Sequence, residues 1–139
     1  MSALRRVAAR PTWLLSRVNA RSQGLLADAF GAEGVRGYHF RLLAALDQYG
    51  PASQAELGRR TGIDRSDVVA TLNELVERGL ARREPDMADL RRNVITMTKR
   101  GADTLERLDR VLDDVQNAVL APLTPSQRET LVRLLAKLT

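Results

Sequence analysis

The chain has 139 residues with 22 Lys or Arg and 17 Asp or Glu, which gives a formal net charge of +5. This length fits one domain, and the positive surplus points either to a polyanionic partner or to a merely solvated surface. The lack of cysteine excludes disulfides and iron–sulfur clusters, and a single histidine excludes a multi-histidine metal site. No apolar run reaches the roughly 20 residues of a membrane-spanning helix. We therefore expect a cytoplasmic protein without a cofactor.

The first two predicted helices are separated by glycine and proline. Pro11 can open a helix whose apolar residues recur at helical spacing until a glycine-rich segment begins at Gly31. A second helix is predicted over 38–49, because Gly50 and Pro51 then break the pattern.

A helix-turn-helix pattern follows. Ser53 and Glu56 form a capping box that begins a short helix, and Gly62 can take the positive φ of a sharp turn. Asp64 is predicted to cap the next helix, over 65–78, and Gly79 is well placed to end it.

The periodicity then changes to that of strands over 80–84 and 93–97. The segment 85–92 between them predicts a hairpin whose loop is too long for a tight turn. A short helix, a glycine turn, an amphipathic helix and a hairpin, in this order, predict a winged helix-turn-helix.

The C-terminal part predicts two more helices. Thr98 caps a long helix that ends near Leu120, and Thr124 begins another capping box with Gln127. Apolar residues spaced three and four apart along the first helix, and leucines along the second, need apolar partners. These residues are Leu105, Leu108, Leu112, Val115 and Val119 in the first helix, and Leu131, Leu134, Leu135 and Leu138 in the second.

Basic and polar residues mark a candidate DNA-binding surface. The helix over 65–78 can lie in a major groove, where its first turn reaches base edges, while the hairpin follows the backbone. Asp67 and Glu74 would repel phosphate, although an acid can accept from cytosine N4 and Asp67 also suits a helix N-terminus. Each of these residues could equally be an ordinary surface residue. The DNA-binding candidates are Ser53, Gln54, Arg65, Ser66, Asp67, Arg91 and Arg92.

Four stretches together resemble the MarR family of bacterial transcription regulators. They are 53–62, 64–66, 75–80, and 89–92 with 98–101. The resemblance implies a homodimer that binds a pseudo-palindromic operator, usually as a repressor, and is released by a small phenolic or aromatic acid. Leu90 stands at a wing position that usually holds arginine. The peroxide-sensing mechanism of some members is excluded, because it requires a cysteine.

The resulting fold class is mainly α with a small β-hairpin wing. Residues 1–36 form an N-terminal dimerisation helix, 37–100 the winged helix-turn-helix, and 101–139 the C-terminal dimerisation helices, all in one intertwined domain per subunit.

A ligand site is a further hypothesis. Trp13 and Arg17 lie four residues apart on one helix face, and together offer a stacking surface and a carboxylate-binding fork. Tyr38 and His39 are the other candidates, since His39 can donate, accept or become charged near neutral pH. The alternative is that the aromatic residues pack in the core, Arg17 pairs with an acid, and His39 is a satisfied interface residue.

Other functions compete with that of a ligand-responsive repressor. One is a winged-helix protein-interaction module or a DNA-binding protein that ignores ligands, and the basic residues at both groove-facing sites favour DNA over protein. The other is an enzyme, which is disfavoured because no G-x-S-x-G, G-x-G-x-x-G or P-loop pattern occurs.

Overall fold

The computed structural model describes residues 4–139, which divide into two compact units. The winged-helix unit is Phe30–Val111, and the terminal unit comprises the residues up to Ala29 together with Leu112–Thr139. The elements in chain order are α1 (Pro11–Ala32), α2 (Gly37–Tyr49), β1 (Ala52–Ser53), α3 (Gln54–Thr61), α4 (Arg65–Glu77), β2 (Ala81–Asp86), β3 (Asp89–Met97), α5 (Lys99–Val119) and α6 (Pro125–Lys137). The prediction of a mainly helical chain with a small wing is confirmed.

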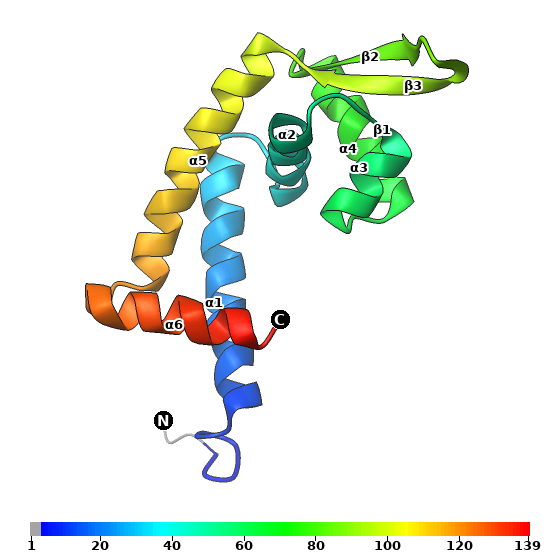
Figure 1. The fold of residues 1–139 in the computed structure, drawn as a ribbon. Helices are drawn as coiled ribbons and strands as arrows, with labels where there is room; N and C mark the ends of the chain where they lie inside the picture. Colours follow the sequence, from blue (N-terminus) through cyan, green and yellow to red (C-terminus); the bar gives the residue numbers. More distant parts are fainter. Residues whose placement is uncertain (1–3) are drawn as a thin grey trace. The chain divides into compact units, whose positions relative to one another are not determined.

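The core of the winged-helix unit lies where α2, α3 and α4 meet the sheet (Figure 1). Burying these apolar side chains is the main force that holds the three helices against β3. The side chains with no exposed surface include Leu42, Leu43, Leu57, Leu72, Leu75 and Ile95.

The helix-turn-helix forms as its capping pattern predicts. The hydroxyl of Ser53 accepts the Glu56 N–H at 3.2 Å, and Gly62 has a φ of 69° at the C-cap of α3. Asp64 is the N-cap residue of α4, but its side chain makes no capping hydrogen bond, so that detail of the prediction is wrong. Only its carbonyl takes part, by accepting the Val68 N–H at 2.9 Å.

The wing is a three-stranded antiparallel sheet with the order β1-β3-β2. The predicted long loop is wrong: Asp86 pairs with Asp89, so only Met87 and Ala88 form the turn of the extended hairpin seen in Figure 1. The turn lacks glycine, but the Asp86 carboxylate accepts the Ala88 N–H at 2.9 Å and so replaces a backbone turn bond. The two-residue strand β1 is too short to leave a periodic signal.

The wing returns to the helices at a tight junction. Thr98 caps α5 as predicted, because its hydroxyl accepts the Gly101 N–H at 3.0 Å and donates to the Gly79 carbonyl at 2.7 Å. At Gly101 an added Cβ would lie 2.1 Å from the Leu80 carbonyl oxygen. The close approach of α5 to the α4–β2 turn therefore requires glycine at this position.

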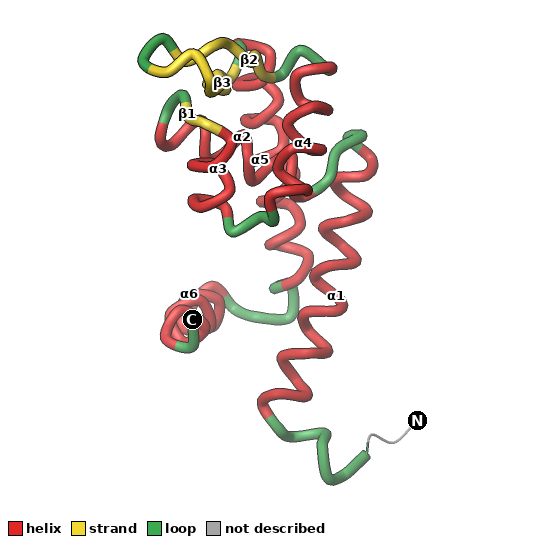
Figure 2. Tube along the Cα trace, turned by 90° about the vertical axis from the view of Figure 1, so that its right-hand side faces the viewer, coloured by secondary structure: helices red, strands yellow, loops and turns green. Residues whose placement is uncertain are grey.

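The terminal unit contains most of α1, the C-terminal end of α5, and α6. The Arg21 guanidinium of α1 donates to the carbonyls of Ala118 and Val119, both at 3.0 Å, and so satisfies the end of α5. Thr124 begins α6 with the predicted capping box. Figure 2 shows α6 standing apart from α1, and α6 buries no residue.

Large apolar side chains stay exposed on α1 and α6. Among the described residues, no helix is both long enough and apolar enough to cross a bilayer. Helical leucines at this density normally face another helix. The exposed apolar residues are Trp13, Leu14, Leu15 and Val18 on α1, and Val132, Leu134, Leu135 and Leu138 on α6.

Candidate nucleic-acid interface

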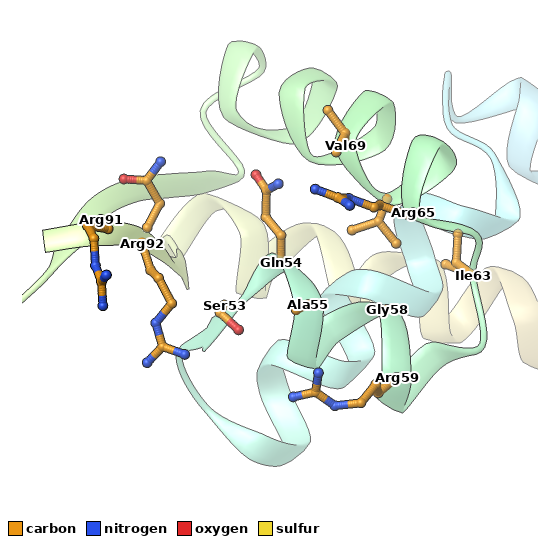
Figure 3. Close-up of a pocket in the computed structure, with 12 residues that line it drawn as sticks. Ser53, Gln54, Ala55, Gly58, Arg59, Ile63, Arg65, Val69, Arg91 and Arg92 are labelled. Atoms are coloured by element: carbon orange, nitrogen blue, oxygen red, sulfur yellow. The ribbon is translucent and has the colours of Figure 1, made fainter. Parts of the chain in front are cut away.

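A groove of about 800 Å³ lies between α3, the first turns of α4 and the N-terminal half of β3 (Figure 3). Its only charged lining residues are arginines, so every formal charge on the lining is positive. It is lined by Ser53, Gln54, Ala55, Gly58, Arg59, Ile63, Arg65, Val68, Val69, Arg91, Arg92 and Asn93.

The first turn of α4 presents the predicted base-reading residues. Arg65 and Ser66 are exposed, and neither makes a side-chain hydrogen bond or ion pair within residues 4–139. Asp67 is half-buried and lies in the first turn, where its charge suits the positive end of the helix dipole. The opposite face of α4 is buried, with Leu72 and Leu75 fully inside, so the packing fixes which face looks outward.

Ser53 and Gln54 lie in the groove, but their side chains already have partners. The Ser53 hydroxyl accepts from Glu56 N–H and donates to Glu56 Oε1 at 3.1 Å. The latter bond, together with one from the Ser53 N–H to the same carboxylate, holds the pKa of Glu56 below its usual value. The Gln54 amide oxygen accepts from Arg83 at 3.4 Å. The structure therefore offers the N-terminal backbone N–H groups of α3 as the better anion donors here.

Both wing arginines are held by carboxylates of the hairpin tip. Arg91 donates to both carboxylate oxygens of Asp89, at 3.0 and 3.1 Å, and Arg92 donates to Asp86 at 3.1 Å. The Arg91 guanidinium lowers the pKa of Asp89, and Asp89 in turn raises the pKa of Arg91. Both guanidinium groups are therefore pre-oriented on an exposed hairpin.

The sequence patterns missed four residues of this surface. Arg59 and Asn93 line the groove, and Asn73 and Arg83 join α4 to the wing through a 2.8 Å hydrogen bond. The helical spacing could have indicated Arg59, because it follows Ala55, which also lines the groove, by four residues on the same face of α3. Asn73 and Arg83 become neighbours only when the hairpin folds against α4.

Glu74 does not face the groove, contrary to the expectation that it would repel phosphate. Its Oε2 accepts from Arg36 at 2.8 Å and lies 2.6 Å from His39 Nε2. Hydrogen bonds from Arg36 and His39 lower the pKa of Glu74, although partial burial opposes this. Its charge is thereby paired with the Arg36 guanidinium and turned away from the groove.

His39 is 1% exposed, and both of its ring nitrogens are engaged. Nδ1 accepts the Arg36 N–H at 2.9 Å, so in the neutral ring the proton sits on Nε2 and is donated to Glu74. Burial lowers the pKa of His39, despite the opposing bond to Glu74.

The remaining ligand candidates lie in separate units. In the terminal unit, the Arg17 guanidinium lies 5.7 Å from the centre of the half-exposed Trp13 ring. In the winged-helix unit, Tyr38 packs against the core, with the Arg41 guanidinium 5.6 Å from its ring. Both aromatic rings therefore carry a cation on one face.

These features define a winged helix-turn-helix with an arginine-lined groove beside its second helix. The model of the MarR family matches residues 33–92. The HTH-type transcriptional repressor NicR of Pseudomonas putida is 29% identical over 99 residues, which cover 71% of this chain and 63% of the repressor. The chain thus matches less than two thirds of the length of that relative.

Two solved structures share the fold over nearly the whole chain. A probable transcriptional regulator from Pseudomonas aeruginosa has a TM-score of 0.82 and 31% identity, and the match covers 94% of this chain and 98% of that one. The PcaV transcriptional regulator from Streptomyces coelicolor, in complex with its natural ligand, has a TM-score of 0.77 and 25% identity, covering 99% and 96%. The chain belongs to the MarR family, which consists of transcription regulators and not of enzymes.

Proposed function

We propose that this protein is a cytoplasmic transcription repressor that binds a pseudo-palindromic operator as a homodimer and is released by a small aromatic acid. The observation that carries the proposal is Arg65 at the start of α4, which is exposed, has no partner among residues 4–139, and lines a groove whose only charged residues are arginines. NicR, which is a transcriptional repressor, supports the same function.

The DNA contacts divide by the chemistry of the side chains. Arg65 and Ser66 sit where a recognition helix reads base edges, while Asp67 is suited to accept from cytosine N4. The α3 N-terminus at Ser53 and Gln54 suits a phosphate, and Arg91 and Arg92 on the wing suit phosphate or the minor groove. Asp86 and Asp89 orient the wing arginines before DNA arrives.

The homodimer is supported by the apolar side chains that α1 and α6 leave exposed. Val18 is 54% exposed and Val132 is 60% exposed, although neither element is a wing or loop. A two-fold dimer presents two recognition helices, which predicts half-sites about 10 bp apart or a multiple of this. Sedimentation analysis should give twice the chain mass, and Val132→Asp should shift the protein toward a monomer.

A competition gel shift tests the DNA-binding function. The purified protein is mixed at fixed salt with the DNA upstream of its own gene and an excess of random duplex. We expect a discrete complex that survives the competitor. Arg65→Ala should weaken this complex by about 1–3 kcal/mol and change random-DNA binding little, if Arg65 reads a base.

Arg110→Ala is the matched control, because Arg110 is exposed on α5 and does not line the groove. Equal losses on operator and random DNA would make Arg65 a phosphate contact. If no fragment forms a complex that survives competition, the repressor function is refuted and a winged-helix protein-interaction module becomes the better explanation.

For the effector we propose two separate sets of candidates: Trp13 and Arg17 in the terminal unit, and Tyr38 and His39 in the winged-helix unit. Trp13 and Tyr38 offer aromatic faces, Arg17 offers a fork for a carboxylate, and PcaV is a relative with a natural ligand. Salicylate and 4-hydroxybenzoate serve as probes in a thermal-shift assay. Arg17→Ala should abolish the shift, whereas Arg133→Ala on α6 should keep it. Equal shifts in wild type and Arg17→Ala would remove Arg17 from the site.

A further inference from the structure

Arg83 of the wing holds two side-chain amides in defined orientations. Its Nη2 atom donates to Asn73 Oδ1 of α4 at 2.8 Å and to Gln54 Oε1 of α3 at 3.4 Å. A guanidinium has only donors, so it must face the oxygen of each amide and never the nitrogen. Both amide NH2 groups therefore point away from Arg83.

The free amide nitrogens face outward. Within residues 4–139 no group accepts a hydrogen bond from Asn73 Nδ2 or Gln54 Nε2. Asn73 is exposed, and Gln54 lines the arginine groove. Gln54 thus presents a donor of known direction to the groove, and Asn73 presents one on the exposed surface of α4.

Asn73 lies on the DNA-facing side of α4. It follows Ser66 by seven residues, or about two helical turns, so both side chains lie on one face. That face is opposite to the buried side chains of Leu72 and Leu75. A recognition helix in a major groove can read bases over about two turns, so Asn73 is within reach of a base edge that Arg65 does not touch.

We propose that Asn73 is a specificity-determining residue, which reads a base acceptor through its NH2 group, and that Arg83 is the positioning residue that fixes the direction of that amide. The inference rests on the proposed DNA-binding function and deepens it. The bases that offer an acceptor to this donor in the major groove are guanine, adenine at N7, and thymine at O4.

Without Arg83, the Asn73 amide is free to flip and to present its oxygen instead. It would then accept from the cytosine or adenine amino group, and discrimination at that base pair would fall. Arg83 itself makes no base contact in this arrangement. Its removal should therefore alter base preference and leave the number of phosphate contacts, and hence the salt slope, unchanged.

The experiment is selection of binding sites from a randomised duplex library, followed by affinity measurements on single-base variants of the selected site. Asn73→Ala should lose about tenfold discrimination at one base pair per half-site and keep the preferences elsewhere. Asn73→Asp replaces the NH2 donor with an acceptor, so it should move the preference at that base pair toward cytosine.

Arg83→Ala should lose discrimination at the same base pair, and the double variant with Asn73→Ala should lose no more than either single variant. Arg82→Ala is the matched control. Arg82 is the neighbouring arginine on β2, and it pairs with Glu84 at 3.4 Å in place of an amide. This control removes the same charge and should keep the selected site.

The outcomes separate the two proposals. If wild type selects no site, the DNA-binding function itself fails. If wild type selects a site that Asn73→Ala leaves unchanged, Asn73 does not read a base and only this inference is overturned. If Arg83→Ala weakens all duplexes equally and flattens the salt slope, Arg83 contacts phosphate and does not position Asn73.

Discussion

Gly101→Ala is expected to destabilise the winged-helix unit strongly, although alanine is the better helix former. The new Cβ would lie 2.1 Å from the Leu80 carbonyl oxygen and 2.9 Å from Met97 Cγ, whereas ordinary contacts begin near 3.4 Å. The Leu80 carbonyl must move by about 1.3 Å, and it also accepts the Thr98 N–H at 3.1 Å.

Overpacking of this kind costs about 1–3 kcal/mol, and loss of the Thr98 hydrogen bond adds about 1 kcal/mol. The gain in helix propensity is only about 1 kcal/mol. The free energy of unfolding should therefore fall by about 1–3 kcal/mol. The obstacle is backbone, so a rotamer change cannot relieve it.

Gly58→Ala in α3 is the matched control, because its Cβ would meet Ile63 and Val68 at an ordinary 3.7 Å. This variant should gain about 0.5–1 kcal/mol. Urea unfolding of both variants and wild type, at one protein concentration, measures the difference. A Gly101→Ala protein as stable as wild type would refute the close-approach argument.

Three further measurements follow from the described contacts. The pKa of His39 is lowered in the folded state, so the unfolded chain takes up a proton first and the free energy of unfolding should fall as the pH drops below about 6.5. His39→Gln should flatten the plot of unfolding free energy against pH between pH 7.5 and 5.5. An unchanged slope would show that other groups cause the loss of stability. Arg91→Ala should reduce the salt slope of DNA binding by about one unit, and an identical slope would exclude a phosphate contact. Ser53→Ala should cost about 0.5–2 kcal/mol in urea unfolding, since it removes the α3 cap, and no loss would show that the cap is dispensable.

The helices were predictable because their ends are encoded locally. Ser53, Thr98 and Thr124 each cap a helix through a residue three positions later, and Gly62 takes the left-handed turn that follows α3. Such signals act within one turn of chain, so a single sequence contains them in full.

The sequence predicted too long a loop for the wing. The reason is that carboxylate side chains, and not glycine, stabilise the turn. Asp86 and Asp89 replace the usual glycine, through bonds to Ala88 N–H and to the two wing arginines. A run of polar residues predicts a loop when only the local sequence is considered. The same residues form two strands here because each lies opposite a residue of the other strand with which it pairs.

The contacts that decide which α4 side chains face outward are long-range and could not be predicted from spacing. Glu74 and Asn73 are adjacent in α4, yet Glu74 turns inward to Arg36 and His39 while Asn73 turns outward to Arg83. A helical wheel alone gives both the same polar label. Their different partners lie 35 residues upstream for Glu74 and 10 residues downstream for Asn73.

The two ends of α4 have opposite roles in this arrangement. At its C-terminal end, Arg78 donates to the Gly34 carbonyl at 2.6 Å, and Glu74 holds Arg36 and His39, so the α1–α2 linker is fastened to the recognition helix. At its N-terminal end, Arg65 has no partner within residues 4–139 and is free for DNA. A displacement of the linker must either break these bonds or move α4. The direction in which α4 presents Arg65 is therefore set by its buried face, with Leu72 and Leu75, together with the bonds at its C-terminal end.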